Sequence, residues 1–78
     1  MEIDLKEARR LIMLAIKNNP TGVDYSRLDR AFVNRMPEMI IGGYGNKLKH
    51  LLDQMMKEGI LSWHVQGYIK GSNFPEDF

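Results

Sequence analysis

The stretch of sequence that decides the fold is residues 48–61, which reads LKHLLDQMMKEGIL. Its apolar side chains recur every three or four positions, as they do on one face of an α-helix. The pattern stops at Gly59, and glycine is the residue that most often follows the last turn of a helix. We therefore predict a helix over residues 46–58 that leads directly into an extended segment. Its buried stripe consists of Leu48, Leu51, Leu52 and Met55.

A β-hairpin is predicted to follow this helix. Residues 60–65 and 68–72 are rich in β-branched and aromatic side chains, and Gln66 and Gly67 lie between them. A two-residue link that ends in glycine is typical of a hairpin turn. In this arrangement Trp63 stacks on Lys70 as a cross-strand cation–π pair. The expected register pairs Trp63 with Lys70, Val65 with Tyr68 and His64 with Ile69.

Two more helices are predicted upstream. The first covers residues 5–18: Asp4 is a favourable N-cap, and Glu7 completes the pattern of a capping box. It ends before Pro20, because a residue that precedes proline disfavours the α conformation. Its expected buried stripe is Leu5, Ala8, Leu11, Ile12, Ala15 and Ile16.

The second helix is predicted to begin at residue 25 or 26, capped by Asp24 or Ser26, and to end at residue 35 before Pro37. Val23, just upstream, can form a strand of one or two residues. Residues 36–45 combine a proline and three glycines with a run of three apolar side chains, and we interpret them as a packed turn. The apolar positions of this second helix are Leu28, Ala31 and Phe32.

Length and composition indicate a single domain over residues 1–78, with a core over about 4–73 and an acidic tail over 74–78. With 78 residues and no cysteine, no disulfide can supplement the core. No stretch approaches the roughly 20 apolar residues that a membrane span needs, so we expect a cytoplasmic protein. The residues expected to meet in the core are Leu11, Ile12, Phe32, Leu48, Leu51, Leu52 and Met55.

The order of helix, short extended link, helix, turn, helix and hairpin resembles a winged helix-turn-helix. Residues 48–61 look like the end of a recognition helix that runs into the wing. The resemblance implies an α+β fold of three helices with a C-terminal two-stranded wing. It also implies a DNA-binding regulator of transcription or of another DNA transaction, and we expect a dimer because one domain with so few cations would reach few phosphates. The turn of about ten residues is longer than in a tight helix-turn-helix. This turn is also similar to that of the LOTUS domain, a winged-helix relative associated with RNA and with protein partners.

The candidate nucleic-acid contacts lie on the third helix and on the wing. An asparagine or glutamine there can read adenine, while lysine or histidine can reach phosphates or guanine. The alternative interpretation is a solvated polar face, and Asp53 at its centre would repel phosphate. The net charge of +1 is also far from the strongly basic balance of many nucleic-acid binders. The candidate residues are Asn46, Lys47, Lys49, His50, Gln54, Gln66 and Lys70.

Two further surfaces remain open as binding sites. Trp63 and Tyr68 could stack on unpaired RNA bases, or they could simply cover the core. The run Met39, Ile40 and Ile41 could contact a protein partner or a second copy of the chain, or it could be folded onto the core. The chain has only two histidines, on different predicted elements, and it has no cysteine. The sequence therefore predicts neither an enzyme nor a metal or cofactor site.

Overall fold

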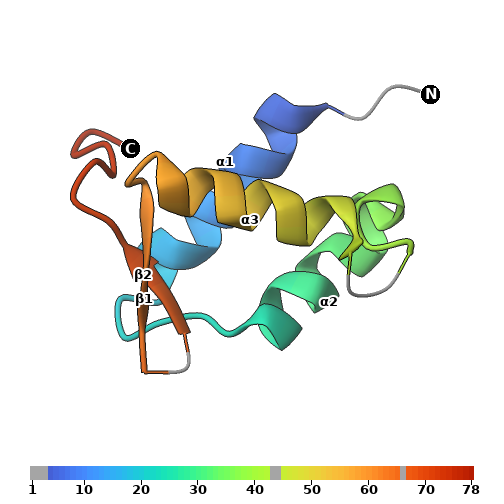
Figure 1. Ribbon diagram of the computed structural model, residues 1–78, viewed down its shortest axis with the longest axis horizontal. Helices are drawn as coiled ribbons and strands as arrows, with labels where there is room; N and C mark the ends of the chain where they lie inside the picture. The colour runs from blue at the N-terminus through green and yellow to red at the C-terminus, as the bar shows by residue number, and fades with distance from the viewer. Residues whose placement is uncertain (1–3, 43–44, 66) are drawn as a thin grey trace.

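Three α-helices followed by a two-stranded antiparallel hairpin make up the fold in a computed structural model of the chain, which describes residues 4–42, 45–65 and 67–78. In Figure 1, α3 crosses in front of α1, and the hairpin follows the C-terminal end of α3. The arrangement is α+β and consistent with the layout of a winged helix, which confirms the predicted fold class. The elements are α1 (Leu5–Asn18), α2 (Tyr25–Arg35), the 3-10 helix η1 (Pro37–Met39), α3 (Lys47–Lys57), β1 (Leu61–His64) and β2 (Gly67–Lys70).

Each α-helix begins after a residue whose side chain caps it. The side-chain oxygens of Asp4, Asp24 and Asn46 each accept a hydrogen bond from the backbone N–H three residues on, at 3.2, 2.9 and 2.8 Å. These bonds satisfy donors that the first helical turn leaves free. The predicted bounds of α1 are confirmed, α2 begins at the earlier of its two predicted residues, and α3 is one residue shorter at each end than predicted.

The capping box predicted at α1 forms only in part. The backbone N–H of Glu7 donates to Asp4, but the Glu7 carboxylate accepts two hydrogen bonds from the Arg10 guanidinium, at 2.6 and 3.0 Å. The hydrogen bond from Arg10 lowers the pKa of Glu7. Glu7 therefore stabilises α1 through an ion pair one turn along the helix.

One cluster of buried side chains, drawn from every helix and from the hairpin, forms the core. All the predicted core residues are in it except Leu11, which packs half-buried at its edge. Leu5 is 53% exposed because the N-terminal end of α1 projects beyond the other elements (Figure 1). Ala31 is exposed as well, whereas Met13 is buried although it lies outside the stripe predicted for α1. The buried residues are Ala8, Ile12, Met13, Ile16, Val23, Leu28, Phe32, Met36, Met39, Leu48, Leu51, Leu52, Met55, Leu61, Tyr68 and Phe74.

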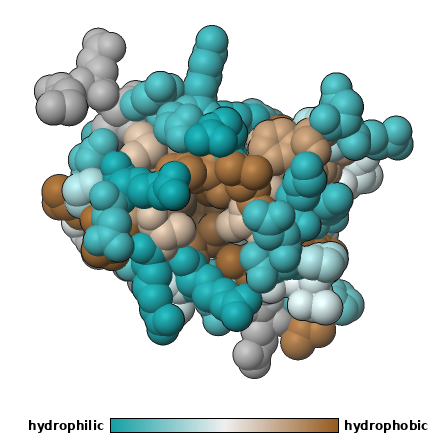
Figure 2. All heavy atoms as spheres, turned by 180° about the vertical axis from the view of Figure 1, so that it is seen from behind, coloured by the Kyte–Doolittle hydropathy of each residue, from teal (hydrophilic) through white to brown (hydrophobic). Residues whose placement is uncertain are grey.

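Some apolar side chains next to the core are exposed at the surface of the molecule. Figure 2 shows the face opposite to that of Figure 1, where apolar side chains remain visible at the centre inside a rim of hydrophilic ones. Several apolar residues pack against the core while keeping part of their surface in solvent, among them Ile40 and Met56. Among the described residues, no helix is long and apolar enough to cross a membrane.

The hairpin register differs from the predicted one by two residues. Trp63 pairs with Tyr68 and His64 with Gly67, so that Val65 follows β1 in the link and Gly67 belongs to β2. Gly67 is therefore a strand residue and not a turn residue. The link between α1 and α2 passes close to its backbone. A Cβ at Gly67 would lie 3.2 Å from the backbone nitrogen of Val23. The glycine permits this close approach, and Val23 forms the expected short extended segment, bridged to Tyr68 by backbone hydrogen bonds of 2.8 and 3.0 Å.

This register also removes the predicted pair of Trp63 with Lys70. The Trp63 ring meets the Tyr68 ring edge to face, with 4.9 Å between centroids and 82° between planes. Lys70 lies opposite Leu61, and its ammonium sits 5.0 Å from the centre of the Phe74 ring.

The C-terminal segment, predicted to be an acidic tail, contributes to the core. Phe74 is buried in the cluster, and Phe78 packs half-buried against it, with the two rings edge to face at 5.8 Å. Gly71 allows the chain to turn here, because a Cβ on this residue would overlap the carbonyl oxygen of Gly59. Asn73 closes the junction by donating its side-chain amide to the Glu58 carbonyl at 2.9 Å.

The apolar run in the turn after α2 does not form a single surface. Met39 is fully buried and Ile40 half-buried, while Ile41 is 71% exposed. Met39 is therefore excluded as a partner contact, contrary to one of the two expectations, and η1 is packed onto the core at this residue. Residues 43 and 44, which belong to the same predicted turn, lie outside the described residues.

Candidate binding site on α3

A groove lies between α2, α3 and the hairpin. It has a volume of about 670 Å³ and is open to solvent on one side. Residues from α2 and α3 face one another across it, and Trp63 and Tyr68 line it from the hairpin. Most of its surface is apolar, although two aspartates and a lysine also line it. The lining residues are Tyr25, Asp29, Ile40, Asn46, Lys49, Asp53, Met56, Trp63 and Tyr68.

Asn46 holds one wall of the groove in place rather than offering a base-reading amide. It is only 4% exposed. Its side-chain oxygen accepts the Lys49 N–H, and its side-chain amide donates to the Tyr25 hydroxyl at 2.7 Å. The prediction that Asn46 lies on the exposed face of the third helix is therefore wrong, because the residue is the N-cap of α3 and ties that helix to α2.

Lys49 is an ion-pair partner within the groove. Its ammonium lies 2.7 Å from an Asp53 carboxylate oxygen, one helical turn further along α3. From the sequence alone, Lys49 is a candidate contact to phosphate or guanine, and Asp53 is a separate charge that repels phosphate. The structure instead places the two charges together, so that a phosphate near Lys49 would meet the Asp53 carboxylate as well.

Two lining residues leave chemical groups available to a ligand. Asp29 stands half-buried on α2, and no hydrogen bond or ion pair reaches its carboxylate from residues 4–42, 45–65 or 67–78. Trp63 is 49% exposed, whereas Tyr68, against which it packs, is buried. Of the two residues proposed to stack on RNA bases, Tyr68 therefore belongs to the core, and Trp63 retains an accessible ring.

A second surface of α3, the outer stripe, faces solvent away from the groove and consists of Lys47, His50, Gln54 and Lys57, all exposed. Of the predicted contacts, Lys47 and His50 lie here as expected. Gln54 donates to Glu58 at 3.2 Å. Lys57 was not among the predicted contacts, although its spacing from residues 50 and 54 places it on the same face.

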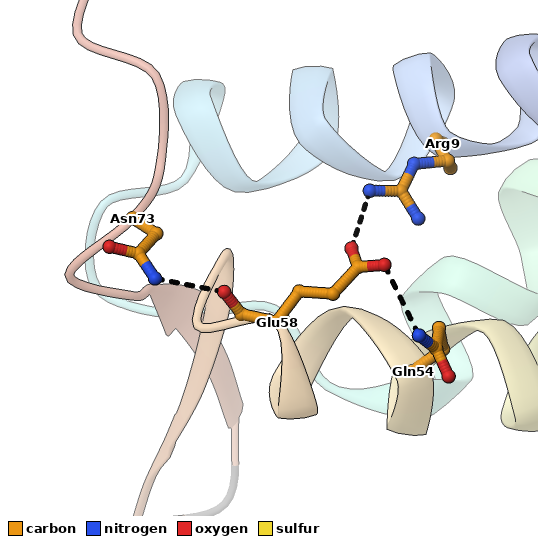
Figure 3. Close-up of polar contacts among 4 residues, drawn as sticks. All are labelled: Arg9, Gln54, Glu58 and Asn73. Atoms are coloured by element: carbon orange, nitrogen blue, oxygen red, sulfur yellow. Dashed lines mark hydrogen bonds and ion pairs between the residues drawn. The ribbon is translucent and has the colours of Figure 1, made fainter.

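Glu58 connects this stripe to α1. Its carboxylate accepts a hydrogen bond from the Arg9 guanidinium at 2.6 Å and another from Gln54, while its backbone carbonyl accepts from Asn73 (Figure 3). The hydrogen bond from Arg9, with a smaller contribution from Gln54, lowers the pKa of Glu58. Gln54 is thus partly occupied by a structural contact.

The predicted wing contacts are not brought together. Lys70 lies at the base of the hairpin, opposite Leu61, rather than at the tip. Gln66 lies outside the described residues. Lys70 was expected to contact nucleic acid from the hairpin tip, but the shifted register places this residue away from the turn.

Sequence reasoning missed the groove and three of its lining residues, Tyr25, Asp29 and Met56, whereas Ile40 was already a candidate partner contact. Tyr25 and Asp29 are four residues apart on one helix, a spacing that places them on one face. Nothing in that spacing indicates that this face meets the flank of α3 that carries Met56. No group of three or more potential metal ligands occurs among the described residues. Comparisons of the chain with protein-family models, with curated proteins and with solved structures find no match.

Proposed function

We propose that this chain is a binding domain that holds a segment of a protein partner in the groove between α2, α3 and the hairpin. The observation that carries the proposal is the groove itself, a concavity of about 670 Å³ lined mainly by apolar and aromatic side chains. Ligand sites are usually concave and largely apolar, with a few polar groups that set orientation. Trp63 at its edge is the type of residue that most often dominates binding energy in protein interfaces.

Nucleic-acid binding is the second candidate, and the outer stripe of α3 favours it. Lys47, His50 and Lys57 are exposed there, and their side chains make no hydrogen bond or ion pair with another described residue. A helix followed by a hairpin is also the arrangement with which winged helices dock on DNA. Against this candidate stand the burial of Asn46, the pairing of Lys49 with Asp53 and the net charge of +1. The groove therefore has the stronger support.

Selection from a random peptide library tests the proposed function. Peptides selected on the wild-type protein should lose about tenfold or more in affinity for Trp63→Ala, as expected when a central interface aromatic is removed. His64→Ala is the matched control, because neighbouring residues of a strand point to opposite faces, and it should bind like the wild type. The proposal is wrong if no peptide is enriched, or if the enriched peptides bind Trp63→Ala equally well.

The same variants separate the other outcomes. If Trp63→Ala dissociates a dimer in sedimentation experiments, the occupant of the groove is a second copy of the chain. For DNA, fluorescence anisotropy with mixed duplexes at low salt is the measurement. Affinity that falls with log salt by about 0.9 log units per phosphate neutralised, and that is lost in Lys47→Ala but not in Trp63→Ala, would favour the nucleic-acid function instead.

A further inference from the structure

The groove carries a carboxylate with which no other described residue forms an ion pair. Among the described residues, three charged side chains line the groove: Asp29, Asp53 and Lys49. Lys49 and Asp53 form an ion pair across 2.7 Å. The carboxylate of Asp29, on α2, has no hydrogen bond or ion pair with another described residue. The described lining residues therefore carry one negative charge in excess, located on α2.

Aromatic rings stand near this charge. Tyr25, one turn before Asp29 on α2, and Trp63 from the hairpin line the same groove. The Tyr25 hydroxyl is held by Asn46 and the Trp63 ring by its edge-to-face contact with Tyr68, so both rings are positioned before any ligand binds. The faces of aromatic rings attract cations, and tryptophan does so most strongly.

We infer that the groove accepts a positively charged side chain of the bound segment, with arginine as the preferred residue; the inference rests on the proposed function. A guanidinium matches both features of the site, because it binds a carboxylate through two parallel N–H donors and stacks on aromatic faces. The aliphatic stem of such a side chain can cover apolar surface while its charge stays at the carboxylate. Ile40 and Met56, both half-buried, provide that apolar surface.

Other ligand classes satisfy the groove less well. A phosphate or a carboxylate would be repelled by Asp29 and by the excess negative charge. A purely apolar side chain would further desolvate the Asp29 carboxylate without pairing it, which is unfavourable. The cationic groups of the outer stripe are not among the residues that line the groove.

Capped tripeptides of sequence leucine-X-leucine, with X as arginine, norleucine or glutamate, test the inference on the ¹⁵N-labelled full chain. Norleucine has an unbranched apolar side chain and carries no charge. We expect the arginine peptide to bind about fivefold more tightly than the norleucine peptide, the range of a partly exposed ion pair, and the glutamate peptide to bind most weakly. Binding is read from the chemical shift of the Trp63 indole N–H.

Asp29→Asn should bring the ratio of arginine to norleucine affinity to about one, whereas Asp77→Asn, an exposed carboxylate outside the groove, should leave the ratio unchanged. The wild-type ratio tests the inference even if Asp29→Asn does not fold. If the norleucine peptide binds as tightly as the arginine peptide, the inference is overturned and the proposed function stands. If no peptide shifts the Trp63 signal at high millimolar concentration, the proposed function is overturned, and the inference with it.

Discussion

Both polar atoms of the Asn46 side chain, the oxygen and the nitrogen, form hydrogen bonds at the site. The oxygen caps α3, and the nitrogen donates to the Tyr25 hydroxyl, so the start of one helix is fixed to the start of another. A buried amide whose hydrogen bonds are satisfied favours one arrangement over its alternatives, because any other arrangement would leave a polar group unpaired. Asn46 thereby sets the separation of two walls of the groove.

Among the described residues, Val65 is the one non-glycine residue with a positive φ. Its φ is 58°, in the left-handed region that β-branched residues rarely adopt. The side chain is 77% exposed, so burial offsets little of the conformational strain. The conformation follows from the hairpin register, which places this residue in the two-residue link.

We expect Val65→Asn to raise the free energy of unfolding by about 1 kcal/mol, because asparagine tolerates the left-handed region. Urea denaturation measures the change. Val33→Asn, at an exposed position within α2, is the control and should bring no gain. A loss of stability in Val65→Asn would mean that the valine side chain contributes more than its exposure indicates.

At the scale of the element, α3 serves three roles through three faces. Leu48, Leu52 and Met55 are fully buried in the core, Lys49 and Met56 flank the groove, and the outer stripe faces solvent. Because an α-helix has 3.6 residues per turn, side chains that are close in sequence point to different faces of the helix. The position of α3 against α1 is set in addition by the contact of Arg9 with Glu58 (Figure 3).

The contact of Arg9 with Glu58 predicts a pH dependence of stability. Because Arg9 lowers the pKa of Glu58 in the folded chain, the ionised carboxylate stabilises the fold above its unfolded pKa. This contribution is lost as the pH falls below about 4 and through the lowered folded value. We therefore expect Glu58→Gln to be less stable than the wild type at neutral pH, with the difference shrinking in acid.

Thermal unfolding from pH 7 downward measures this difference. Glu76→Gln, which removes a carboxylate with no hydrogen bond or ion pair to another described residue, is the control and should follow the wild type throughout. A deficit of Glu58→Gln that stays constant with pH would show that the ionised form of Glu58 is not what stabilises the contact.

At the scale of the whole molecule, the C-terminal segment adds to a core that is small. Phe74 joins the buried cluster, and its ring is flanked by Phe78 and by the Lys70 ammonium. In a chain of 78 residues without disulfides, each buried aromatic is a large part of the available apolar burial. The acidic residues around it keep the outer side of the segment in solvent.

We expect Phe74→Ala to lower the free energy of unfolding by about 3 kcal/mol, the lower end of the range for a buried phenylalanine. Phe78→Ala should cost less, since Phe78 is only partly buried, and Glu76→Ala should cost little. Urea denaturation of the three variants ranks them. Equal stabilities would refute the packing of residues 74–78 on the core.

The sequence by itself determined the helices, their caps and most of the core. These features depend on residues three or four apart, such as Asp4 and Glu7, which interact within one helical turn. Two interactions at the candidate site that the sequence prediction did not include also join residues only three or four positions apart. The position of Asn46 just before the helix marks it as a cap, and the four-residue spacing of Lys49 and Asp53 is that of a helical ion pair.

Only the tertiary structure decided the hairpin register, the burial of Phe74 and the groove. The register depends on the backbone bridge between Val23 and Tyr68, which are 45 positions apart in the sequence. Val23 can approach the hairpin this closely because the neighbouring residue, Gly67, has no side chain. The groove is formed by residues of α2, α3 and the hairpin, which come together only in the folded chain. Local periodicity assigns a residue to a face of its own element, but which faces meet depends on how the whole core packs.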